Sequence, residues 1–159
     1  MQQRIVTAEE GHPAAVTGEY REGDETVRLL MPLTMMNESG LAVKAARVAA
    51  PDVLLVCDDV NLPLGAIRLR PDGGPGGHHG LQSCLEALAT EQVARLRIGV
   101  GSVPLPQDLR DFVLSPFLST ERPLLKGAIA QAVEACEAWT KEGIEMAMNQ
   151  YNRAPDTAS

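Results

Sequence analysis

The sequence predicts an α/β fold: a single three-layer domain with a twisted, mostly parallel mixed sheet and helices on both faces. Three observations predict it. Short apolar segments of strand length alternate along the chain with segments of helical periodicity. Of the 159 residues, 45% are hydrophobic and 22% are charged, which suits one compact core. The sequence contains no internal repeat, which argues against a repeat architecture.

Four segments have the pattern of β-strands. Residues 27–31 (VRLLM) and 52–58 (DVLLVCD) are short apolar runs bounded by Gly, Pro or Asp, which is typical of strands buried on both faces. Residues 66–70 (AIRLR) and 95–101 (RLRIGVG) alternate polar with apolar side chains. We therefore expect each of these two strands to bury one face and to present arginines on the other.

Three segments have helical periodicity: residues 37–50, residues 80–89, and a long segment from Ser119 to about Asn149 with Pro123 in its first turn. The residues expected to face the core are Leu41, Ala45 and Val48 in the first, Leu81, Cys84, Leu85 and Leu88 in the second, and Leu125, Ile129, Val133 and Cys136 in the third. Residues 1–151 are expected to form the domain and residues 152–159 a frayed tail.

Charge and composition exclude several classes of protein. The formal net charge of −7 argues against a generic polyanion binder, so any contact with nucleic acid would need a local basic patch. Cys57, Cys84 and Cys136 are odd in number and lie far apart in apolar segments, which is typical of reduced, buried thiols. The sequence has no signal-peptide pattern and no apolar run long enough to span a membrane. We expect a cytoplasmic protein without metal or cofactor.

A glycine-rich loop precedes the second helix, in the stretch DGGPGGHHGLQSCLEALA at residues 72–89. Glycines let backbone amides approach an anion or a sugar closely, and the start of the helix adds partial positive charge. The loop is not a nucleoside-triphosphate motif, because no Lys or Thr follows it and Pro75 removes an amide donor. A flexible connection is the alternative interpretation.

Polar residues follow two of the predicted strands. Asn37 stands where a helix is expected to begin, so it is either an N-cap or a site residue. Asp58 ends a buried strand, where it either orients a ligand-side group or forms a turn, and Asp59 is expected to face water. We expect Asn37, Asp58 and the glycine loop to surround a single cleft.

Taken in order, these motifs resemble those of the bacterial-type peptidyl-tRNA hydrolase family. The resemblance covers roughly residues 14–151. The matching residues are Thr34, Met36, Asn37, Ser39 and Gly40 for T-x-M-N-x-S-G; Asp58, Leu62, Pro63 and Gly65 for D-x-x-x-L-P-x-G; Gly73, Gly74, Gly76, Gly77, His78, Gly80 and Leu81 for G-G-x-G-G-H-N-G-L; Arg95 to Gly101 for R-L-R-I-G-x-G; and Phe112 to Leu114 for F-V-L.

The resemblance implies hydrolysis of the ester that joins a stalled peptide to the 3′ adenosine of tRNA. In this chemistry a histidine activates water, an aspartate orients that histidine, and asparagines hold the substrate and the developing oxyanion. The resemblance places Asp58 as the orienting aspartate, Met36, Asn37, Gly77 and His79 in substrate binding, and Arg68, Arg70 and Arg97 on tRNA phosphates. The same three arginines are alternatively solvated charges on two strands. The implied partner is the acceptor stem and 3′ end of peptidyl-tRNA.

Two departures from the family pattern bear on activity. The family begins with a strand, a G-L-G-N-P-G loop and an R-H-N segment that supplies the catalytic histidine, and nothing in this chain resembles them. We therefore expect a domain without the usual first strand and first helix, and without the usual general base. The second departure is His79, which stands at a position where the family has asparagine.

These departures raise the question of which residue could replace the missing general base. His79, paired with Asp58, is a candidate, whereas His12 is expected to be solvated and His78 to support the loop. The complete family domain is expected to be monomeric. In this chain the neighbours of the missing strand would have unpaired edges, which favours self-association.

Two alternative functions stay open at this point. One is a catalytically inactive remnant that still binds tRNA. The other is an unrelated α/β domain that binds a small phosphorylated ligand at the glycine loop, which the order of the motifs disfavours.

Overall fold

The structure is a computed structural model that describes residues 2–7, 13–102 and 104–152. The chain divides into two compact units, each assembled from two separate stretches of sequence. Unit 1 comprises residues 1–53 and 72–93, and unit 2 comprises residues 54–71 and 94–159. The glycine loop therefore belongs to unit 1, whereas the two arginine-bearing strands belong to unit 2.

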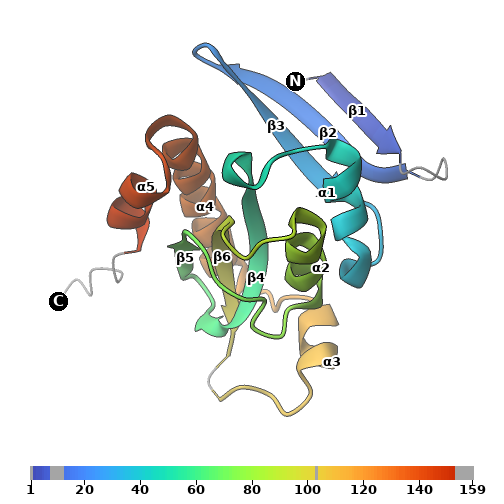
Figure 1. Cartoon of the computed structure of the whole chain (residues 1–159). Helices are drawn as coiled ribbons and strands as arrows, with labels where there is room; N and C mark the ends of the chain where they lie inside the picture. Colours follow the sequence, from blue (N-terminus) through green and yellow to red (C-terminus); the bar gives the residue numbers. More distant parts are fainter. Residues whose placement is uncertain (1, 8–12, 103, 153–159) are drawn as a thin grey trace. The chain divides into compact units, whose positions relative to one another are not determined.

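Unit 1 contains an antiparallel sheet in the order β1 (Gln2–Thr7), β2 (Pro13–Glu22) and β3 (Glu25–Pro32). A short 3-10 helix η1 (Met36–Glu38) leads into α1 (Gly40–Ala46), which packs against β1 and β2 (Figure 1). The 3-10 helix η2 (Ala50–Asp52) and α2 (His79–Leu88) complete the unit, and α2 packs on α1. A small core forms where Ala14 and Ala15 of β2 meet Ala42 of α1.

Unit 2 contains a mixed sheet in the order β4 (Leu54–Pro63), β6 (Ala94–Gly101) and β5 (Ile67–Arg70). The β4–β6 pair is parallel and the β5–β6 pair is antiparallel, as the predicted mixed sheet requires. The helices are α3 (Leu109–Leu114), α4 (Arg122–Glu142) and α5 (Ile144–Tyr151). Helices α4 and α5 pack on β5 and α4 packs on β6 (Figure 1), so one face of this sheet forms the main core.

All four predicted strands are present, and the alternation predicted for residues 66–70 is confirmed. Ile67 and Leu69 are buried on one face of β5 and Arg68 and Arg70 are exposed on the other. For residues 95–101 the predicted exposed arginine face is wrong, because Arg95 is buried like its neighbour Leu96 and Arg97 is half-buried. The strands β1 and β2 were not predicted. Burial on both faces was wrong for the two apolar strands, because β3 has no fully buried residue and Val56 of β4 is 53% exposed.

The helices differ from the prediction in length and in the residues that they bury. The predicted helix over residues 37–50 is only the short α1, which ends where Arg47 adopts a left-handed conformation with φ 51°. Its buried residues are Gly40, Ala42 and Val43, while Leu41 and Val48 are exposed. The predicted core face of α2 is confirmed at Leu81, Cys84 and Leu85.

The long C-terminal helix is divided in two at Gly143, whose φ of 84° is in the region that favours glycine. The predicted inward stripe is also wrong, because Ile129 and Val133 are exposed and a stripe of alanines is buried instead. Small side chains let α4 lie close to the sheet, which explains why alanines replace larger residues at this contact. The buried alanines are Ala128, Ala132, Ala135 and Ala138 of α4 and Ala147 of α5.

Four strands, β1, β3, β4 and β5, have one neighbour each within the described parts of the chain. β3 pairs only with β2, and β4 pairs only with β6. Leu29, Met31 and Leu33, at alternating positions, are 47%, 60% and 47% exposed. An edge strand with exposed apolar side chains is a template for pairing with another chain.

The free edge of β5 is satisfied differently, by a side chain. Asn152, the last described residue, accepts a hydrogen bond from the Leu69 N–H at 2.7 Å and donates one to the Leu69 carbonyl at 2.9 Å. These are the two bonds that a neighbouring strand would make. Asn152 is thus part of the packed unit, and residues 153–159, which were predicted to form a frayed tail, lie outside the described part.

We expect Asn152→Ala to lower the free energy of unfolding by about 2 kcal/mol, because it leaves the Leu69 N–H and carbonyl without partners. Urea unfolding measures this change. Gln150→Ala is the matched control, since Gln150 bonds only the exposed Glu142 and its loss should cost less than about 0.5 kcal/mol. Equal stabilities of the two variants would show that Asn152 does not hold this edge.

Candidate active site

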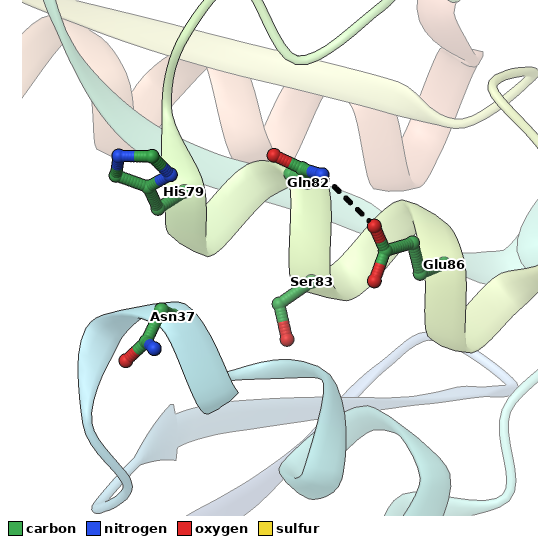
Figure 2. Close-up of a pocket in the computed structure, with 5 residues that line it drawn as sticks. All are labelled: Asn37, His79, Gln82, Ser83 and Glu86. Atoms are coloured by element: carbon green, nitrogen blue, oxygen red, sulfur yellow. Dashed lines mark hydrogen bonds between the residues drawn. The ribbon is translucent and has the colours of Figure 1, made fainter.

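A polar groove in unit 1 brings together residues from η1, α1 and α2. Figure 2 shows the part of about 190 Å³ that is lined by Asn37, His79, Gln82, Ser83 and Glu86. A second part of about 240 Å³ shares Asn37, Ser83 and Glu86 with the first and continues along α1 to Leu41 and Lys44. We refer to the two parts together as the α1–α2 groove.

One wall of the groove is a single face of α2. His79, Gln82, Ser83 and Glu86 follow one another at intervals of three and four residues, which places them in one row along a helix. The Gln82 amide donates a hydrogen bond to the Glu86 carboxylate at 3.0 Å, so these two side chains are tied together. The His79 ring lies at the end of this row, across from Asn37 (Figure 2).

Asn37 forms part of the opposite wall. It lies within η1 and does not cap α1, so the N-cap interpretation is wrong. The residue is exposed, and its side chain makes no hydrogen bond to any other described residue. The Asn37 amide is therefore available to donate to, and accept from, a molecule in the groove.

The glycine loop has a defined backbone that requires glycine. Gly73, Gly76 and Gly77 have φ values of 129°, 58° and 84°, all in the range that other residues rarely adopt. A Cβ at Gly77 would meet no atom within 4 Å, so its conformation, and not crowding, is the reason for glycine there. The loop thus leads into α2 with a defined backbone conformation, which argues against a merely flexible connection.

His78 fixes the junction between this loop and α2. Its Nδ1 accepts a hydrogen bond from the Leu81 N–H at 3.0 Å, which satisfies one of the unpaired amides at the start of the helix. The backbone N–H of His78 donates a hydrogen bond to the Pro75 carbonyl at 3.0 Å. His78 therefore makes the contacts expected of a loop-supporting residue.

In unit 2, the two aspartates of β4 have different surroundings. Asp58 is half-buried, and β4 continues beyond it to Pro63, so Asp58 is not the last residue of its strand. Asp59 was expected to face water, which is wrong: only 7% of it is exposed. One Asp59 oxygen accepts from the Asn61 N–H at 2.9 Å and the other lies 3.4 Å from a guanidinium nitrogen of Arg97.

Four arginines share one face of the β5–β6 pair. The antiparallel register sets Arg68 opposite Arg97 and Arg70 opposite Arg95. Arg68 and Arg70 are exposed, whereas Arg95 is buried. Like charges in opposed positions destabilise a sheet unless a counter-charge lies nearby, and Asp59 supplies one to Arg97. Arg95 was not among the predicted site residues, although the alternation of residues 95–98 places it on this face.

The cysteines are free thiols, and burial keeps them protonated. Burial raises the pKa of Cys57 to about 11, an effect that the neighbouring Arg97 partly opposes. Burial also raises the pKa of Cys84 and of Cys136. At neutral pH these side chains are therefore weak nucleophiles and behave as small apolar groups.

The described residues hold no cluster of three or more His, Cys, Asp or Glu side chains with the geometry of a metal site. Within the same residues, every helix is too short or too polar to cross a bilayer.

The structure brings some of the predicted site residues together. Asn37 and His79 line one groove, and Met36 packs on Gly80 next to it. Asp58, Arg68, Arg70 and Arg97 belong to unit 2, so a common cleft for Asn37 and Asp58 stays a prediction. His12 lies outside the described residues. The sequence analysis missed Gln82, Ser83 and Glu86, although their spacing from His79 on a predicted helix could have identified them.

Comparisons with known proteins agree with the motifs. The model of a family described as "Peptidyl-tRNA hydrolase" matches residues 2–158. A peptidyl-tRNA hydrolase from Syntrophomonas wolfei is 40% identical, over 92% of this chain and 81% of the relative. One from Methylacidiphilum infernorum is 42% identical, over 80% and 71%. A crystal structure of peptidyl-tRNA hydrolase from Acinetobacter baumannii superposes with a TM-score of 0.79 at 30% identity, over 94% of this chain and 77% of the other. These comparisons confirm the predicted α/β class.

Proposed function

Because the chain belongs to the peptidyl-tRNA hydrolase family, an ester-hydrolase family, we propose that it cleaves the ester between a peptide and the 3′ adenosine of tRNA in the cytoplasm. The products are free peptide and reusable tRNA. The observation that carries this proposal for the present chain is the α1–α2 groove, in which Asn37 and His79 stand on opposite walls. A tRNA-binding remnant without catalysis is not favoured by relatives that are themselves hydrolases.

We assign the substrate-binding role to Met36, Asn37, Gly77 and His79. Ester hydrolysis develops negative charge on the carbonyl oxygen, and a fixed amide donor stabilises that charge. The unengaged Asn37 amide supports this role. His79 has a ring nitrogen that can donate one hydrogen bond, as the family's asparagine does at this position. Met36 packs beside Gly80 and supplies an apolar surface next to the two polar groups.

His79 is also a candidate for a second role, that of the general base that activates water. Of the two described histidines, His78 uses Nδ1 to accept from the Leu81 amide, and only His79 lines the groove. In that case we propose that Asp58 accepts a hydrogen bond from the N–H of the other ring nitrogen and orients the ring, the role that the family resemblance gives to Asp58 toward the family's usual histidine. The two roles of His79 predict opposite effects of an asparagine at this position.

Hydrolysis of purified N-acetyl-aminoacyl-tRNA by the full chain tests the proposed function. We expect Asn37→Ala to lower kcat/KM by about 100-fold or more, because it removes a donor to the developing oxyanion. Gln150→Ala, on the exposed side of α5, should keep the wild-type rate. Absence of hydrolysis by the wild-type chain would overturn the proposed activity.

The same assay separates the two roles of His79. If His79 binds substrate, His79→Asn keeps activity and His79→Ala loses it. If His79 is the general base, both variants lose activity, because an amide cannot take up the proton.

The exposed arginines support a role for the β5–β6 face in binding tRNA phosphates. Arg68 and Arg70 are exposed, and Arg97 stands opposite Arg68 with its guanidinium held near Asp59. Phosphate contacts give affinity that falls steeply with salt concentration. A clustered arginine face also allows a chain with net charge −7 to bind a polyanion locally.

We expect Arg70→Ala to weaken tRNA binding and to reduce the slope of log K against log salt concentration by about 1, because one phosphate contact is lost. Fluorescence anisotropy across a salt series measures both quantities. Arg28→Ala is the control, since Arg28 is already paired with Glu19 at 3.0 Å. An unchanged slope for Arg70→Ala would remove Arg70 from the tRNA contact.

We also propose that the chain self-associates through β3. This strand has one free edge among the described strands, and its exposed residues Leu29 and Met31 lose apolar surface when a second copy pairs with it.

Light scattering after size exclusion should therefore give a mass above that of one chain, and this mass should rise with protein concentration. We expect Met31→Lys to restore the monomer, because a charged edge resists pairing. Leu118→Lys, which changes an equally apolar residue that is 65% exposed outside the strands, should not. A monomeric wild type would contradict the proposal.

A further inference from the structure

The first turn of α1 is capped by a residue from a different helix. The residue before α1, Ser39, makes no side-chain cap, because its hydroxyl donates to the Met36 carbonyl at 2.8 Å. The Gly40 N–H instead donates to the hydroxyl oxygen of Ser83, on α2, at 2.9 Å. The two residues are 43 positions apart in the sequence, so this bond joins two separate elements of unit 1.

Two glycines let these elements approach closely at neighbouring points. A Cβ on Gly40 would overlap the carbonyl oxygen of Ser83, and a Cβ on Gly80 would overlap the sulfur of Met36. The backbone of α1 therefore rests directly on α2 at Gly40, and the side chain of Met36 rests on the backbone of α2 at Gly80.

These contacts lie on either side of Asn37 in the sequence. Met36 is the residue before it, and Gly40 follows three positions later. The Ser39 bond to the Met36 carbonyl closes the turn between them. With both ends of this turn held against α2, the backbone of Asn37 has a set position relative to α2, which carries His79.

From this arrangement we propose that Ser83 is a positioning residue for the reaction: it caps α1 across the groove and thereby sets the place of the Asn37 amide opposite His79. The proposal rests on the proposed function only in taking Asn37 as a substrate-binding group. Ser83 does not act as a nucleophile in this scheme. Its side chain points toward the η1–α1 segment, whereas the His79 ring points away from it (Figure 2).

Ser83→Ala and Ser83→Thr, compared in the full chain, test the proposal. Alanine removes the hydroxyl that accepts the Gly40 N–H, and threonine keeps it. Ser115→Ala is the matched control, because it removes an exposed hydroxyl on which no groove residue depends. Two NMR readouts do not require activity: hydrogen exchange of the Gly40 amide, and the chemical shifts of the Asn37 side-chain NH2 group.

The expected result for Ser83→Ala is at least tenfold faster exchange at Gly40 together with displaced Asn37 side-chain signals. Ser83→Thr and Ser115→Ala should match the wild type in both readouts. In hydrolysis of N-acetyl-aminoacyl-tRNA, we expect Ser83→Ala to raise KM about fivefold more than it changes kcat.

Unchanged Asn37 signals in folded Ser83→Ala would overturn the proposal, even if Gly40 exchanges faster, because Ser83 would then cap the helix without placing Asn37. If the wild type fails to hydrolyse the substrate, the proposed function fails. The NMR readouts would then still decide whether Ser83 positions Asn37.

Discussion

The candidate site depends on the contact between α2 and the segment that runs from η1 into α1. Gly40 and Gly80 remove the side chains that would keep the two elements apart, and the hydroxyl of Ser83 closes the contact with a hydrogen bond. The two walls of the groove are thus held by backbone packing. Asn37 and His79 belong to opposite sides of this contact. A change in the separation of the two elements would therefore alter the distance between the two side chains that we propose bind the substrate.

A second constraint is the register of β5 against β6. Leu69 and Leu96 are fully buried on the face that α4 and α5 cover, so a shift of one residue would exchange leucines for arginines in the core. The apolar face therefore fixes the place of the arginines on the other face. Asp59, buried beside Arg97, offsets part of the repulsion within this cluster.

Sequence reasoning predicted the features that depend on local pattern. Strands β4, β5 and β6, helix α2 and the arginine face follow from alternation and periodicity, and the motifs identified Asn37 and His79. It failed where a partner elsewhere in the chain decides the outcome. Residues 13–22 are held as a strand by pairing with β3, and Asp59 is buried because Arg97 reaches it. Ser83 accepts a hydrogen bond from the Gly40 N–H, and no spacing rule connects these two residues.

The capping bond of His78 also fixes the tautomer of its imidazole. Because Nδ1 accepts the Leu81 N–H, the proton of the neutral ring must be on Nε2. With its only proton on Nε2, the ring leaves Nδ1 open to the Leu81 amide, and the first turn of α2 stays closed at the residue next to His79. His78 thus bears on the α1–α2 groove through the start of the helix that carries His79, without lining the groove itself.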